Sequence, residues 1–156
     1  MKTSKEFPPN WNAIQIAFPG IAEHRPIFTY GDTIHNPFDR SVPSDIIFHE
    51  SVHTVQQGDF PDVWWERYLS DAAFRLDQEI EAYGAQYAFV LRHIKNGRLN
   101  KMALASMAQA LSGESYGKLL SFGEAESKIR RYARENPVPE KREERSGHIF
   151  TGGGTI

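Results

Sequence analysis

Two histidines four residues apart enclose a glutamate in the segment His49-Glu50-Ser51-Val52-His53. On a helix, such residues lie about 40° apart around the axis, so both imidazoles point the same way. Two neutral imidazoles on one face are the usual beginning of a tetrahedral zinc site. Glu50 then lies beside the metal, where a carboxylate can act as a general base. The pattern predicts a zinc centre if a helix and a third ligand accompany it.

The residues around the pair are typical of a helix. Ser44 is a suitable N-cap, Asp45 is an acid for the first turn, and Gly58 suits the position just past the end. The stretch 45–57 contains no Gly or Pro. Apolar residues occur on several sides of this stretch, which predicts a helix buried in the centre of the domain; they are Ile46, Phe48, Val52 and Val55.

A catalytic zinc site has three protein ligands and one position for water. The chain has no Cys, so the third ligand must be His, Asp or Glu. The next strong helix is predicted from about Ser70, as its cap, to Ile94, with Gly97 ending it. It contains Glu79 and Glu81, which lie about 200° apart around a helix, so only one of them can face the metal.

At this point the chain resembles the gluzincin zinc metallopeptidases. In that group a helix with the pattern E-x-x-A-[D/N] follows H-E-x-x-H, and Glu79-Ile80-Glu81-Ala82-Tyr83 matches its E-x-x-A part. The resemblance implies that Glu79 is the third ligand, with Glu81 as the alternative. Tyr83 departs from the Asp or Asn of these relatives, which holds a ligand histidine in the correct tautomer. Because Tyr83 lies one turn after Glu79, its hydroxyl could take over part of that role.

A narrower resemblance is to small uncharacterised metallopeptidase-like proteins of phages and bacteria. These combine H-E-x-x-H-x-x-x-Q, a Trp-Trp segment and the E-x-x-A helix, here His49 to Gln57, Trp64-Trp65 and Glu79 to Ala82. The likeness covers about residues 27–94. Trp64, Trp65 and Tyr68 are expected in a short helix, where they pack the core rather than bind substrate.

The segment before the motif is predicted to form a small antiparallel sheet. Alternation of Ile14, Ile16 and Phe18 indicates a strand, and two further runs flank Gly31-Asp32 as a hairpin. In gluzincins an edge strand of such a sheet holds the substrate backbone in extended form. By that likeness the candidate edge strand is formed by Thr33, Ile34, His35 and Asn36. The simpler interpretation is that these residues merely end the sheet, with His35 exposed.

The C-terminal third is predicted to be helical over 99–111 and 125–135, with a short helical turn over 116–120 between them. Tyr116 is a candidate hydrogen-bond donor to an oxyanion, as Tyr or His is in related enzymes, although packing would also explain it. From Asn136 onward, Pro, Gly and mixed charges predict a flexible tail over 137–156. We expect one α+β, zincin-like domain over 1–136, mostly helical, with a small sheet.

The composition of the chain limits the kinds of binding partner and the cellular location that we expect. The formal net charge of −2 gives no electrostatic reason to expect nucleic acid. There is no apolar run of about 20 residues and no apolar segment after the polar N-terminus, so neither a membrane span nor a signal peptide is expected. Together with the lack of Cys, this predicts a cytoplasmic or phage-associated protein whose partner is a peptide or protein substrate.

The leading hypothesis is therefore a zinc-dependent metallopeptidase. His49, His53 and Glu79 would hold Zn²⁺, and Glu50 would activate its water. One alternative is a catalytically silent, zincin-fold binding module, which the departure at Tyr83 favours. Another is a virion or assembly protein in which zinc is structural. The intact Glu50 favours catalysis, because a structural site needs no base.

Overall fold

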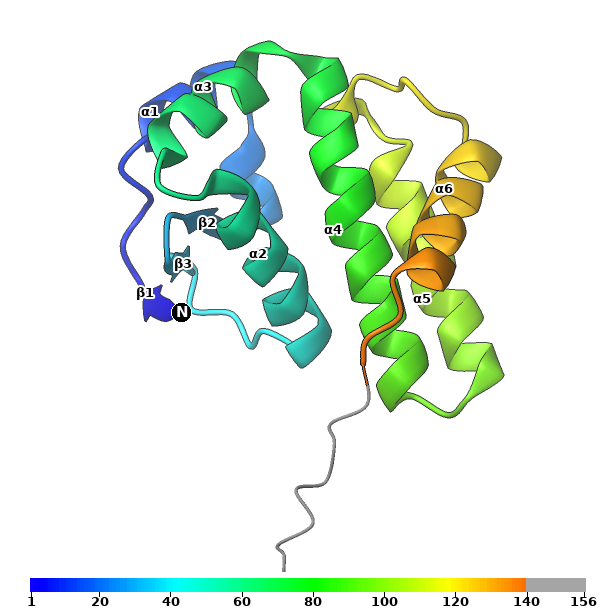
Figure 1. Cartoon of the computed structure of the whole chain (residues 1–156). Helices are drawn as coiled ribbons and strands as arrows, with labels where there is room; N and C mark the ends of the chain where they lie inside the picture. Colours follow the sequence, from blue (N-terminus) through cyan, green and yellow to red (C-terminus); the bar gives the residue numbers. More distant parts are fainter. Residues whose placement is uncertain (140–156) are drawn as a thin grey trace, which may run out of the picture.

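The computed structural model describes residues 1–139, and this part is mostly helical with one small sheet. Its helices are α1 (Trp11–Ala17), α2 (Ser44–Gln57), α3 (Pro61–Ser70), α4 (Ala72–His93), α5 (Gly97–Leu111) and α6 (Phe122–Glu135), with 3₁₀ turns η1 (Ile21–His24) and η2 (Glu114–Tyr116). The strands are β1 (Lys2–Ser4), β2 (Phe28–Tyr30) and β3 (Thr33–His35). Helix α4 runs through the middle, with α2 and the sheet on one side and α5 and α6 on the other (Figure 1). None of the helices in residues 1–139 is long and apolar enough to span a membrane.

The sheet is mixed, not antiparallel as predicted. Its order is β1-β3-β2, with β1 parallel and β2 antiparallel to β3. The strand Lys2–Ser4 is polar, so its composition did not indicate a strand. Because β3 is paired on both sides, the prediction that Thr33, Ile34, His35 and Asn36 form a substrate-binding edge is wrong. His35 is also buried, and its Nδ1 lies 3.0 Å from the carbonyl oxygen of Glu6.

Residues 14–18 form the end of α1 and the residue after it, not a strand. Ile14 is fully buried, whereas Ile16 is 82% exposed, so the alternating residues do not share one face. Buried Ile14 packs in one cluster with the partly buried Trp11 and Phe18, and the three residues follow a helical spacing. A three-residue alternation was too short to exclude this helical pattern.

The helices fall close to their predicted ranges, but different residues cap them. No side chain caps α2, which begins at the predicted cap Ser44. Asp71 rather than Ser70 caps α4, accepting a hydrogen bond of 2.9 Å from the Phe74 N–H. Gly97 begins α5 instead of ending α4, because Asn96 caps the new helix. Ser121 and Glu124 form a capping box at α6.

Two apolar cores lie on either side of the pair of helices α2 and α4 (Figure 1). The first joins α4, α5 and α6 through residues such as Leu104, Leu111 and Ile129. The second joins α1, β2 and α3 through Ile14, Phe28, Trp64, Trp65 and Tyr68, as expected for the aromatic segment. The tail predicted for 137–156 lies outside the described residues from position 140 onward, and Val138, before that point, packs against the first core.

Candidate metal centre

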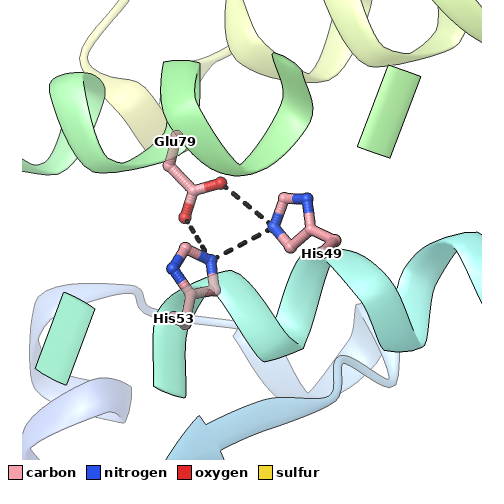
Figure 2. Close-up of side chains that lie close together, drawn as sticks. All are labelled: His49, His53 and Glu79. Carbon is pink, nitrogen blue, oxygen red and sulfur yellow. Dashed lines mark hydrogen bonds and ion pairs between the residues drawn. The ribbon is translucent and has the colours of Figure 1, made fainter. Parts of the chain in front are cut away.

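Helices α2 and α4 bring His49, His53 and Glu79 together (Figure 2). The two histidine Nε2 atoms lie 3.1 Å apart. Glu79 Oε2 lies 3.5 Å from Nε2 of His49, and Glu79 Oε1 lies 3.4 Å from Nε2 of His53. The fourth-residue spacing of the histidines puts both on one face of α2, as the motif predicted. Glu79, rather than Glu81, faces them from the adjacent helix.

The donor set fits a metal ion such as Zn²⁺. His49 and His53 are each 7% exposed and Glu79 is 3% exposed, so water does not solvate the three groups freely. Glu79 Oε2 is buried and makes no hydrogen bond. A buried carboxylate oxygen without a hydrogen bond is costly, and a cation among these atoms would satisfy it. Two imidazoles and a carboxylate are one of the ligand sets of catalytic zinc sites.

The buried side of α2 is polar. Its buried residues are His49, Glu50, His53 and Gln57, whereas Val55 is 79% exposed. The expectation of an apolar helix in the domain centre is therefore wrong. The helix presents the motif residues inward and part of its apolar surface outward. A buried polar stripe of this kind needs hydrogen-bond partners on the neighbouring elements.

Two glutamines hold the two candidate ligand histidines through the ring nitrogen that faces away from the cluster. Nδ1 of His49 lies 3.1 Å from Oε1 of Gln86, whose Nε2 donates to Asp45. Nδ1 of His53 lies 2.7 Å from Oε1 of Gln56. Such contacts fix the tautomer in which Nε2 is free for a metal. They replace the contact expected from Tyr83.

Tyr83 and Glu81 occupy other positions around the site. The Tyr83 ring meets the His49 ring edge to face, with centroids 4.6 Å apart, and its hydroxyl is hydrogen bonded to Tyr116. Glu81 accepts a hydrogen bond of 3.1 Å from Nε2 of Gln56. It therefore supports His53 indirectly.

Inside the cluster, the buried Glu79 carboxylate and the histidines stabilise each other's charged forms. Burial alone would lower the pKa of His53, but the Glu79 carboxylate, together with Glu50 and Gln56, outweighs burial and raises that pKa to about 9 in the metal-free protein. Burial alone would raise the pKa of Glu79, but His53 and His49 hold it well below its usual range. The Tyr68 hydroxyl donates a 2.5 Å hydrogen bond to Glu79 Oε1. Glu79 therefore stays ionised, as a metal ligand must be.

The carboxylate of Glu50 is held beside the cluster by Thr29 of β2. The Thr29 hydroxyl lies 2.7 Å from Glu50 Oε2 and 3.3 Å from the Glu50 carbonyl oxygen. Thr29 is only 2% exposed. This contact with one carboxylate oxygen fixes the direction of the other, Oε1.

A cavity of about 230 Å³ adjoins the three candidate ligands and Glu50. Its walls include Tyr83 and Tyr116 near the cluster, and an apolar side formed by Ile14, Phe18, Ile21, Pro26, Ile27 and Phe28. Burial raises the pKa of Tyr83 and of Tyr116 above the usual range, so both hydroxyls keep their protons. The lining of the cavity thus combines two protonated hydroxyls with the Glu50 carboxylate.

Sequence reasoning missed Thr29, Gln56, Tyr68 and Gln86. Gln86 follows Glu79 by seven residues and so shares its helix face, which is a signal that could have found it. Gln56 lies three residues after His53, on the same side of α2. Thr29 and Tyr68 carry no such signal, since only the packing of β2 and α3 brings them to the site.

No protein-family model matches the chain, and no curated protein or solved structure matches it either. The likeness to gluzincins thus depends on the motif residues alone.

Proposed function

We propose that the protein is a zinc-dependent hydrolase of peptide bonds, of the gluzincin type. The observation that carries this proposal is the position of Glu50. Its carboxylate is buried beside the His49, His53 and Glu79 cluster and is oriented by Thr29 toward the shared cavity. A site that only stabilised the fold would need no oriented base.

His49, His53 and Glu79 would hold the ion, and Gln86, Gln56 and Tyr68 keep these three side chains in place. When bound, zinc supplies a Lewis acid that polarises the scissile carbonyl and lowers the pKa of a water ligand. Glu50 accepts the proton of the attacking water and returns it to the leaving amine. The Tyr116 hydroxyl donates its proton to the Tyr83 oxygen, so Tyr83 is the residue that donates a hydrogen bond to the carbonyl oxygen as negative charge develops on it.

The ligand count favours this proposal over structural zinc. Within residues 1–139, the group that could hold a metal consists of three side chains, which leaves a coordination position for water. A structural site usually has four protein ligands.

The decisive test is Glu50→Gln in the zinc-loaded full chain. The variant should keep stoichiometric zinc, measured by elemental analysis, and lose peptide hydrolysis by about 10²–10⁴-fold, because the base is gone and the ligands remain. Glu66→Gln, at an exposed position of α3, is the matched control and should leave both unchanged. Hydrolysis by Glu50→Gln at the parent rate would refute the mechanism.

A further inference from the structure

The outer edge of β2 is already occupied where it passes the candidate site. The Thr29 carbonyl accepts hydrogen bonds from Gln57 Nε2 at 2.8 Å and from Trp65 Nε1 at 3.1 Å. The Gly31 N–H donates to Gln57 Oε1 at 2.7 Å. Since β3 pairs with the other edge of β2, these groups point away from the sheet toward α2 and α3.

The amide of Gln57 therefore takes the place of a paired strand. It satisfies one carbonyl and one N–H, as the peptide group of an added strand would. An extended substrate pairing with β2 at Thr29 would have to displace both of these hydrogen bonds and the one from Trp65. Losing these hydrogen bonds disfavours such pairing, and any buried partner left without a hydrogen bond disfavours it further. Thr29 is 2% exposed, so the edge is closed beside Glu50.

The cavity beside this closed edge is small. Its volume of about 230 Å³ is below the roughly 300–1,000 Å³ of pockets that hold drug-sized ligands. The wall away from the metal ligands is apolar, formed by α1, η1 and the start of β2. Such a space suits one or two small residues, with an apolar side chain against that wall.

We propose that the site selects short peptides, of about two to four residues with an apolar residue beside the scissile bond, and rejects extended polypeptide segments. This inference rests on the hydrolase activity proposed above. Gln57 and Trp65 act as specificity-determining residues, because they occupy the backbone groups that a longer substrate would use.

The test is a length series with the zinc-loaded full chain. Leu- and Phe-containing peptides of two, three, four, six and ten residues are compared by kcat/KM, with mass spectrometry to locate each cut. We expect kcat/KM to fall at least tenfold from the best short peptide to the ten-residue peptide. Internal cleavage of the ten-residue peptide at a comparable kcat/KM would overturn the selectivity and leave the hydrolase intact. If no peptide of any length is cleaved, the proposed hydrolase activity itself fails.

Two variants locate the cause of the selectivity. Gln57→Leu keeps the approximate size of the side chain and frees the Gly31 N–H, so the ratio of kcat/KM for long over short peptides should rise several-fold. Trp65→Phe keeps an aromatic ring and removes one donor, so the ratio should rise less. Val55→Ala, at an exposed position of α2, is the control and should leave the ratio unchanged. An unchanged ratio in both folded variants would refute the role of the occupied edge. If Gln57→Leu fails to fold, the ratio in Trp65→Phe and the length series with the parent protein test this role instead.

Discussion

The two faces of α4 are packed by opposite means. Toward α2 it presents Glu79 and Gln86, which meet a stripe of buried His, Glu and Gln side chains. Toward α5 and α6 it presents apolar residues such as Leu76 and Val90, which join a core of Leu, Met, Ile and Ala. Even Gly84 has a role on that second side, since a Cβ there would lie 2.4 Å from the Tyr132 ring. Both faces are buried, but only the face toward α5 and α6 is apolar and stabilises the fold through burial of apolar surface.

The difference assigns separate tasks to the two interfaces. Buried polar groups cost free energy unless each finds a partner, whereas apolar burial stabilises directly, by about 25 cal/mol per Å². The α2–α4 interface supplies most of the partners but leaves Glu79 Oε2 without a hydrogen bond. We therefore expect changes in the polar interface to alter metal binding, and changes in the apolar core to alter stability.

The largest effect should come from removing the candidate third ligand. Glu79→Ala deletes one of three ligands, and zinc affinity should fall on the order of a thousandfold. Titration of the metal-free protein with Zn²⁺ measures this. Glu81→Ala, two residues away on α4, is the matched control and should change affinity far less. Equal losses in the two variants would contradict the geometry of the cluster.

The next largest effect is expected from a substitution in the apolar core between α4, α5 and α6. Leu111 is fully buried among α4, α5 and α6, so Leu111→Ala should lower the free energy of unfolding by about 2–5 kcal/mol through lost burial and a cavity. Urea unfolding of the metal-free protein gives the value. The zinc affinity of the folded Leu111→Ala variant, measured at urea concentrations below the unfolding transition, should match that of the parent protein. A large loss of zinc affinity in the folded variant would show that the two interfaces are not separate.

The pH dependence of the metal-free protein should also come from the polar face. The pKa of His53 is raised from 6.5 to about 9, so its contribution is complete below about pH 6.5 and lost as pH rises through 9. The pKa of Glu79 is lowered from 4.5, so its contribution is present above pH 4.5 and lost as pH falls. Stability should therefore be highest between about pH 4.5 and 6.5.

Urea unfolding in the presence of a chelator at pH 5.5 and pH 9.5 tests this dependence. Each pKa unit corresponds to about 1.4 kcal/mol. In the His53→Gln variant, the free energy of unfolding should fall less between pH 5.5 and pH 9.5 than in the parent protein. A parent protein that is more stable at pH 9.5 than at pH 5.5 would rule out the ion pair between His53 and Glu79.

The smallest effect concerns the support of His49. Gln86→Leu removes the acceptor at Nδ1, and zinc affinity should weaken by about 10–100-fold. Gln109→Leu, on the exposed side of α5, should leave zinc affinity unchanged. If Gln86→Leu binds zinc as tightly as the parent, Gln86 serves packing alone.

Local patterns predicted the helices more reliably than the sheet. The 3.6-residue period and the absence of breakers located α2, α4, α5 and α6 to within a few residues. The strand prediction failed at α1, where Trp11, Ile14 and Phe18 follow a helical spacing. The sheet also includes β1, whose polar residues carry no strand signal. Strand pairing depends on contacts between distant segments, so a single sequence encodes it weakly.

By itself the sequence determined which residues could form the candidate site. Spacing along α2 places His49 and His53 on one face, and spacing along α4 separates Glu79 from Glu81, because helix geometry is local. Only the tertiary structure decided what surrounds these residues. It set Thr29 against Glu50, gave the role expected of Tyr83 to Gln86, and closed the edge of β2 with Gln57 and Trp65. These contacts join elements far apart in the chain, and their directions follow from packing rather than from any local period.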